Sequence, residues 1–88
     1  MYEFYVRIDK LTNRAPSLIS LAEEYELVGT SEATSRSEAV RNWFNGELSS
    51  EYSERVSKPK VGDVVRDWRG DCFILCPEGL WALVATSS

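Results

Sequence analysis

The sequence predicts a small α+β domain built from one sheet and two helices. An alternating pattern of apolar and polar residues opens the chain at 2–8, a capped amphipathic pattern follows at 35–45, and short apolar runs fill 61–86. Alternation with a period of two residues is typical of a half-buried strand, and recurrence every three to four residues is typical of a helix. We therefore expect the order β-α-β-α-β-β-β, in an antiparallel or mixed sheet with both helices packed on one face.

The length and composition are those of one globular domain. The chain has 88 residues, of which 43% are hydrophobic and 27% are charged. A chain of this size can bury one modest core and has no room for a second. We expect a single domain over 1–88, with a β-α-β-α half at 1–46, a loop at 47–60 and a three-stranded β-meander at 61–86.

The first half begins with a strand and a short helix. The apolar side of the expected strand consists of Tyr2, Phe4, Val6 and Ile8. A polar stretch with a proline follows, and apolar residues then recur at helical spacing, which predicts a helix near 17–25. Leu27 and Val28 lie in the next segment, 26–33, where the expected order places the second strand.

The second helix has a clear start and a clear end. Ser35 followed by Glu38 is a capping box, in which the serine side chain accepts from the glutamate amide and the glutamate reaches back to the cap. Gly46 after Asn45 supplies the left-handed residue that commonly ends a helix. Between these signals lies one apolar stripe, made of Ala39, Val40, Trp43 and Phe44.

The last third has the character of β-structure. Three short apolar runs begin at Val61 and are separated by glycine-containing tripeptides at 69–71 and 77–79. Such tripeptides are typical turn sequences. The simplest assembly of three runs joined by short turns is an antiparallel meander.

Catalytic and metal-binding interpretations find little support. The chain has no histidine, which removes the commonest general base and the commonest metal ligand. Cys72 and Cys76 supply half of a tetrahedral zinc site, and in one strand they would lie about 13 Å apart, too far for a disulfide. An enzymatic function would have to depend on Asp63, Asp67 or Cys76. Aspartate is common beside turns because it forms local hydrogen bonds there, which explains Asp63 and Asp67 without catalysis. We expect a non-enzymatic protein without a cofactor or metal.

The charge is mildly acidic. Of the net −4, residues 1–54 hold ten acidic and five basic side chains, and residues 55–88 hold four and five. This balance disfavours non-specific binding to a nucleic-acid backbone, which needs a basic surface. The chain has no apolar stretch long enough for a membrane span and opens without the pattern of a signal peptide, so we expect it in the cytoplasm.

Aromatic residues are the best candidates for a binding surface. The chain has three tryptophans, and adjacent rings such as Trp43 and Phe44 cannot both point inward, so some aromatic surface is expected to be exposed. The acidic stretch 47–54 is suited to a basic partner surface. The candidate partner-binding residues are Trp43, Glu47, Glu51, Tyr52, Glu54, Trp68, Arg69 and Trp81.

Two kinds of partner fit such a surface. Exposed aromatic side chains anchor protein interfaces, and the net negative charge favours a protein partner. The alternative is single-stranded nucleic acid, whose bases would stack on Trp68, Phe73 and Trp81.

The last third also resembles a known module. Tyr52 and Ser57 precede Val-Gly-Asp-Val-Val at 61–65, an apolar run at 73–75 and a glycine shortly before a tryptophan at 79–81. This pattern is similar to the C-terminal part of the YodL-like domains, a module of small proteins from phages and other mobile elements. The resemblance implies such an element as the context. There we expect an inhibitor that binds a protein of the host or of the element, for example in a CRISPR-type defence system.

Overall fold

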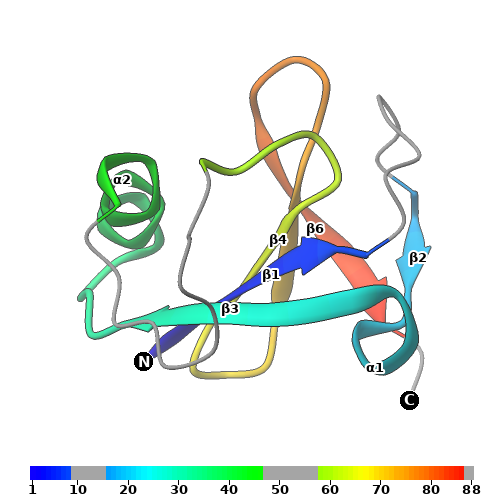
Figure 1. Cartoon of the computed structure of the whole chain (residues 1–88), viewed down its shortest axis with the longest axis horizontal. Coiled ribbons are helices and arrows are strands. Elements are labelled where there is room, and N and C mark those ends of the chain that lie inside the picture. Colours follow the sequence, from blue (N-terminus) through cyan, green and yellow to red (C-terminus); the bar gives the residue numbers. More distant parts are fainter. Residues whose placement is uncertain (9–15, 47–57, 87–88) are drawn as a thin grey trace.

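A computed structural model describes residues 1–8, 16–46 and 58–86 of the chain (Figure 1). The elements are, in chain order, β1 (Tyr2–Arg7), β2 (Leu18–Ile19), α1 (Leu21–Glu24), β3 (Tyr25–Ser31), α2 (Arg36–Asn45), β4 (Val64–Arg66), β5 (Cys72–Leu75) and β6 (Trp81–Thr86). The expected α+β class is confirmed, since one mixed sheet of six strands is accompanied by two helices. Neither of these described helices is long and apolar enough to cross a membrane.

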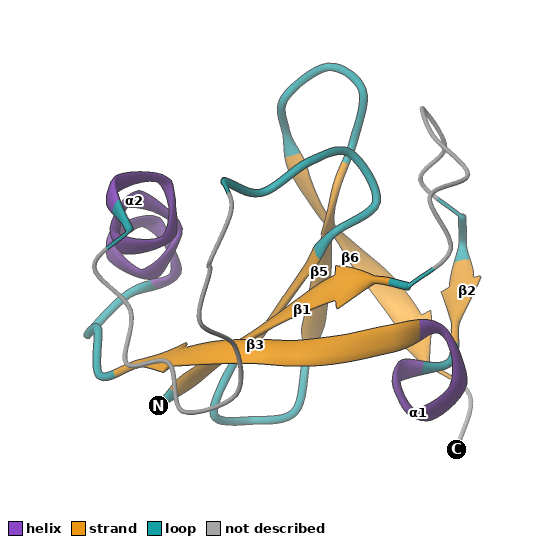
Figure 2. Cartoon of the chain, viewed as in Figure 1, coloured by secondary structure: helices purple, strands orange, loops and turns teal. Residues whose placement is uncertain are grey.

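The strands lie in the order β2-β6-β5-β4-β1-β3. β4, β5 and β6 are antiparallel neighbours, as the three apolar runs predicted, and β1 pairs antiparallel with both β4 and β3. β2 pairs with β6 in parallel. The two edge strands, β2 and β3, are joined by the single turn of α1, so the sheet curls back on itself (Figure 2).

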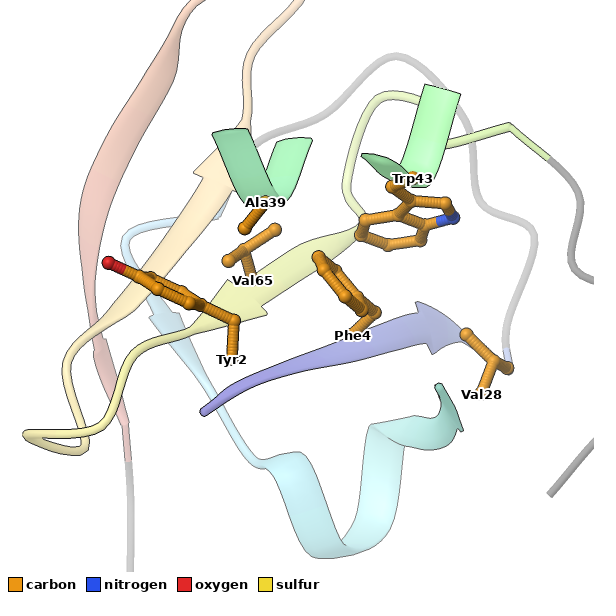
Figure 3. Close-up of a cluster of buried hydrophobic side chains, with 6 residues drawn as sticks. All are labelled: Tyr2, Phe4, Val28, Ala39, Trp43 and Val65. Atoms are coloured by element: carbon orange, nitrogen blue, oxygen red, sulfur yellow. The ribbon is translucent and has the colours of Figure 1, made fainter. Parts of the chain in front are cut away.

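Curling gives the sheet an inner and an outer face, each with its own buried cluster. Adjacent residues of β4 lie in different clusters, Val64 in the inner and Val65 in the outer, and both are fully buried. The inner cluster consists of Ile19, Tyr25, Val64, Cys72, Ile74 and Val84. The outer cluster consists of Tyr2, Phe4, Val28, Ala39, Trp43 and Val65 (Figure 3). Both faces of β4 therefore contribute to the core.

The outer cluster forms because α2 lies over β1 and β4. Ala39 and Trp43 lie one turn apart and point onto the sheet, and the Trp43 ring lies 4.8 Å from the ring of Phe4 (Figure 3). Phe44, the next residue, is exposed. The two adjacent aromatic rings thus point in different directions, as the sequence predicted.

The ends of α2 follow the predicted capping pattern with one change. The Ser35 side chain accepts from the amide of Glu38 (3.2 Å), and Gly46 ends the helix in the left-handed conformation with φ of 73°. The Glu38 carboxylate, however, accepts from the hydroxyl of Thr34 (2.9 Å) and does not return to Ser35. The hydrogen bond of the Glu38 carboxylate back to the start of the helix is therefore made with Thr34, one residue before the cap residue Ser35.

The helix predicted near 17–25 is largely replaced by strand. α1 keeps four residues of it, while β2 precedes α1 and Tyr25 begins β3. Local spacing favoured a helix, but Ile19 and Tyr25 are both buried in the inner cluster, where pairing with β6 and β1 satisfies their backbone groups. Tertiary packing overrides a local propensity of this size. β2 also adds an element to the expected order.

The prediction that both helices pack on one face is also wrong. Ala39 and Trp43 of α2 belong to the outer cluster, whereas Leu21 of α1 packs against the inner cluster. α1 is too short to cover a face, and its place between the two edge strands determines which cluster it meets.

A short segment before β4 ties three strands together. The Asp63 side chain, 6% exposed, accepts from the backbone amides of Arg7 in β1 (3.2 Å) and Lys60 (2.8 Å). The Asp63 carbonyl accepts from the amide of Leu75 in β5 (3.0 Å). The carbonyl of Gly62, whose φ is 94°, accepts from the hydroxyl of Tyr25 in β3 (2.6 Å). This segment thus fixes where β4 enters the sheet.

Replacing Trp43 by alanine is expected to lower the free energy of unfolding by about 3–5 kcal/mol, because losing a fully buried indole leaves a large cavity. Trp68→Ala is the matched control. Trp68 is 66% exposed, so its loss should change the free energy by about 0.5 kcal/mol or less. Urea unfolding followed by circular dichroism measures both, and equal effects would contradict this placement of the two rings.

Asp63→Asn is expected to lower the free energy of unfolding by about 1–3 kcal/mol. Asparagine has one acceptor oxygen where the carboxylate has two, so the amide of Arg7 or of Lys60 loses its partner. Asp67→Asn is the control. One oxygen of Asp67 accepts from the amides of both Arg69 and Asp71, so the single acceptor oxygen of asparagine can keep both bonds. The free energy of unfolding is therefore expected to fall by only about 0.5 kcal/mol. Thermal and urea unfolding of the pair test this, and a smaller loss in Asp63→Asn than in Asp67→Asn would refute it.

The same carboxyl predicts a pH dependence. Burial raises the pKa of Asp63 above its ordinary 3.8, although the amides of Lys60 and Arg7 act in the opposite direction. The folded state then binds the proton more tightly than the unfolded state, so the stability that Asp63 contributes falls as pH rises from about 3.8 through the raised pKa. We expect the stability advantage of the wild type over Asp63→Asn to shrink as pH rises above about 3.8, measured by urea unfolding. A stability advantage of the wild type that grows with pH would show that the pKa of Asp63 is lowered in the folded state, which would contradict this prediction.

Candidate functional site

Neighbouring residues on the outer face become more exposed with distance from α2. Val65 of β4 pairs with Phe73 of β5, and Phe73 pairs with Leu83 of β6, so the three side chains form a row on one face. Val65 is fully buried, Phe73 is partly buried and Leu83 is 68% exposed. The cover that α2 gives to the outer face therefore reaches Trp81 at the start of β6 but ends before Leu83.

The exposed row continues onto the edge strand. Ala85 lies two residues after Leu83 in β6 and so on the same face of the sheet. It pairs with Leu18 of β2, which is 58% exposed. We name these four residues, Phe73, Leu83, Ala85 and Leu18, the outer strip. It is an apolar surface that crosses three neighbouring strands.

A shallow hollow of about 510 Å³ adjoins the outer strip. Its lining brings Gly70 and Asp71 of the β4–β5 turn together with Leu83 and Ala85 of β6. The hollow therefore places this turn next to the outer strip.

The β4–β5 turn presents an aromatic ring to solvent. Trp68 is 66% exposed, and the guanidinium carbon of Arg69 lies 4.7 Å from the centre of its ring. One oxygen of the Asp67 carboxylate accepts from the amides of Arg69 and Asp71, both at 2.9 Å. Trp68 is thus displayed on a turn whose backbone is held by hydrogen bonds.

A second arginine stacks on the outer strip itself. Arg36, the first residue of α2, is exposed, and its guanidinium carbon lies 3.9 Å from the centre of the Phe73 ring. Arginine and tryptophan are enriched among the residues that dominate binding energy at protein interfaces. The outer strip and the β4–β5 turn combine both residue types with exposed aliphatic side chains.

A second hollow, of about 410 Å³, shares Gly70, Cys72 and Thr86 with the first. At its rim the Arg66 guanidinium donates to Glu3 (3.0 Å), and the Tyr5 hydroxyl donates to the same carboxylate oxygen (3.3 Å). Burial and the Glu3 carboxylate raise the pKa of Tyr5, and burial raises the pKa of the Cys72 thiol. Both groups are therefore neutral at physiological pH, which leaves Cys72 a weak nucleophile.

The residues on which an enzymatic interpretation would rest have structural contacts. The carboxylates of Asp63 and Asp67 each accept from two backbone amides. Cys76 is a free thiol, as is Cys72, and its sulfur lies 3.8 Å from the carbonyl oxygen of Ile74. Among the residues that the structure describes, no three Cys, Asp or Glu side chains gather in a way that could hold a metal ion.

The predicted partner-binding residues differ in how exposed they are in the structure. Trp68 and Arg69 are exposed on the β4–β5 turn. Trp81 is partly buried, with its ring 6.1 Å from that of Trp43. Including Trp43 was wrong, because it has no exposed surface and belongs to the outer cluster. The remaining four candidates lie outside the described residues and are Glu47, Glu51, Tyr52 and Glu54.

The sequence analysis named Phe73 only as a base-stacking candidate and missed the other three residues of the outer strip, Leu83, Ala85 and Leu18, together with Arg36. The signal for the outer strip was the run Leu-Trp-Ala-Leu-Val-Ala at 80–85, which lacks the polar alternation of a strand with one wet face. Such a run indicates apolar residues on both faces of a strand. Here Val84 fills the inner cluster, whereas Leu83 has no cover among the described residues. The stacking of Arg36 on Phe73 had no local signal, because the two residues are far apart in the chain.

Comparisons with known proteins add no relative. No family model matches the chain, and neither a curated protein nor a solved structure matches it. The similarity to the YodL-like module therefore stays a prediction. Of its residues, Tyr52 and Ser57 lie outside the described part, and Val-Gly-Asp-Val-Val at 61–65 forms the turn around Asp63 and the start of β4.

Proposed function

We propose that this chain is a non-enzymatic binding domain whose partner is another protein, and that the contact surface is the outer strip together with the β4–β5 turn. The observation that carries the proposal is the exposure of Leu83 (68%) and Leu18 (58%) on the paired strands β6 and β2, next to a hollow that is also bordered by the turn carrying the exposed Trp68 (66%). Single exposed apolar residues are common, but an apolar row over three strands beside an exposed tryptophan is typical of an interaction surface.

Several features support a protein partner over single-stranded nucleic acid. Base stacking needs rings with open faces. Phe73 lies under Arg36, Trp81 packs toward Trp43, and one face of Trp68 lies under Arg69. Phe73 and Trp81 are thus partly covered, and only Trp68 keeps an open ring face, so the three rings do not form a continuous stacking platform. The net charge of −4 also opposes a phosphate backbone.

The partner belongs to a context that the sequence resemblance suggests. A small domain that needs surface complementarity and no active site is suited to stoichiometric inhibition. We propose a protein of a bacterial host or of a mobile element as the target, with CRISPR-type defence components as the first to test.

The test is affinity capture from a bacterial lysate at physiological salt, followed by mass spectrometry. We expect the wild type to retain a partner that Leu83→Glu loses. Leu80→Glu is the matched control. Leu80 is equally exposed (68%), but it comes just before the first residue of β6 and does not line the hollow. Circular dichroism establishes that both variants fold.

Two results would refute the proposal. One is capture of no protein by the wild type. The other is loss of the partner in Leu80→Glu with retention in Leu83→Glu, which would place the contact elsewhere. Titration of tryptophan fluorescence with oligonucleotides tests the rival function, since stacking would quench the emission and salt would weaken the effect.

A further inference from the structure

We infer that the partner presents carboxylate groups beside apolar side chains, and that Arg36 and Arg69 bind these carboxylates while the outer strip receives the apolar groups. This inference rests on the proposed function and specifies the chemistry of its partner as an acidic, apolar peptide segment.

The first step is the pairing of the arginines. Arg7 and Arg66 have carboxylate partners, at 3.5 Å from Glu24 and 3.0 Å from Glu3. Arg36 and Arg69 have none within ion-pair distance among the described residues. These two guanidiniums therefore keep their charge available at the surface.

The second step is how the two arginines are held. Each is stacked on a ring, Arg36 on Phe73 at 3.9 Å and Arg69 on Trp68 at 4.7 Å. A guanidinium that lies over an aromatic ring is attracted to the ring face and can still donate its N–H groups to a carboxylate. A side chain that is already oriented also loses less conformational entropy when a partner binds. Both arginines are thus oriented to donate hydrogen bonds to a carboxylate of the partner.

The third step is where they lie. Phe73 is part of the outer strip, beside Leu83, and the turn that carries Trp68 and Arg69 borders the adjoining hollow. The cations therefore flank an apolar surface. Asp71 lines the hollow and Asp67 lies in the same turn, so these two carboxylates equal the two guanidiniums in number. The Asp67 carboxylate already accepts from two backbone amides, whereas neither guanidinium has a carboxylate partner among the described residues.

The fourth step separates an acidic peptide from a polyanion. The whole chain carries −4, so a long, uniformly negative ligand would be repelled away from the two arginines. A segment with a few carboxylates and apolar residues between them meets the local cations and avoids most of that repulsion. Local complementarity of this kind supplies specificity more than long-range attraction.

The experiment is selection of peptides from a random displayed library on the immobilised full chain. We expect enrichment of sequences that combine Asp or Glu with Leu, Phe or Trp. The selected peptides are then synthesised, and their affinities for variants are measured by fluorescence anisotropy. Arg36→Glu and Arg69→Glu should each weaken binding about tenfold or more.

Arg41→Glu is the matched control, because Arg41 is an exposed arginine of the same helix that stacks on no ring among the described residues. It should leave the affinity within about twofold. Raising the salt concentration should weaken binding to the wild type more than to the Arg36→Glu/Arg69→Glu double variant, since exposed ion pairs are screened.

The outcomes distinguish this inference from the proposed function. Peptides that are basic or uncharged but lose binding in Leu83→Glu would overturn the carboxylate inference and leave the contact surface in place. Acidic peptides that bind Arg36→Glu and Arg69→Glu as well as the wild type would also overturn it. Peptides insensitive to Leu83→Glu, or no enrichment at all, would refute both.

Discussion

The buried carboxylate of Asp63 is the contact on which the rest of the structure depends. It accepts from an amide at the end of β1 and from one in the segment before β4, and the neighbouring Gly62 carbonyl receives the Tyr25 hydroxyl from β3. Side-chain acceptors thus satisfy backbone donors at the point where the chain enters the centre of the sheet, and groups buried there would be costly to leave unpaired. With β4 fixed between β1 and β5, Val64 and Val65 reach opposite faces and two clusters form.

The size of α2 explains why one of these faces is incomplete. Six strands about 4.8 Å apart span about 24 Å across a sheet. A helix of ten residues is about 15 Å long and about 10 Å wide, so it cannot cover such a sheet. The inner face avoids this shortage because curling lets its own strands enclose it. The outer face does not, and β6 and β2 carry apolar residues there without cover from the described part of the chain.

The predictable features were those encoded within a few neighbouring residues. Ser35 and Gly46 marked the ends of α2, and the tripeptides at 69–71 and 77–79 marked the turns of the meander. Features set by distant contacts were not predictable. Ile19 became strand because β6 was available as a partner, and Trp43 was buried while Trp68 was exposed because of what each met in space. The candidate site could not be predicted from the sequence for the same reason, since the exposure of Leu83 depends on how far α2 extends over the sheet.

The pairing of β2 with β6 also has a consequence for how the protein is made. It joins residues 18–19 to residues 85–86, so the inner cluster needs strands from both ends of the described chain. Contacts between segments this distant in sequence slow folding, because a large loop must close before they form. During synthesis, Ile19 and its neighbours would wait, exposed, until β6 had emerged from the ribosome. Among the described strands, β6 is thus the one whose synthesis must precede closure of the inner cluster.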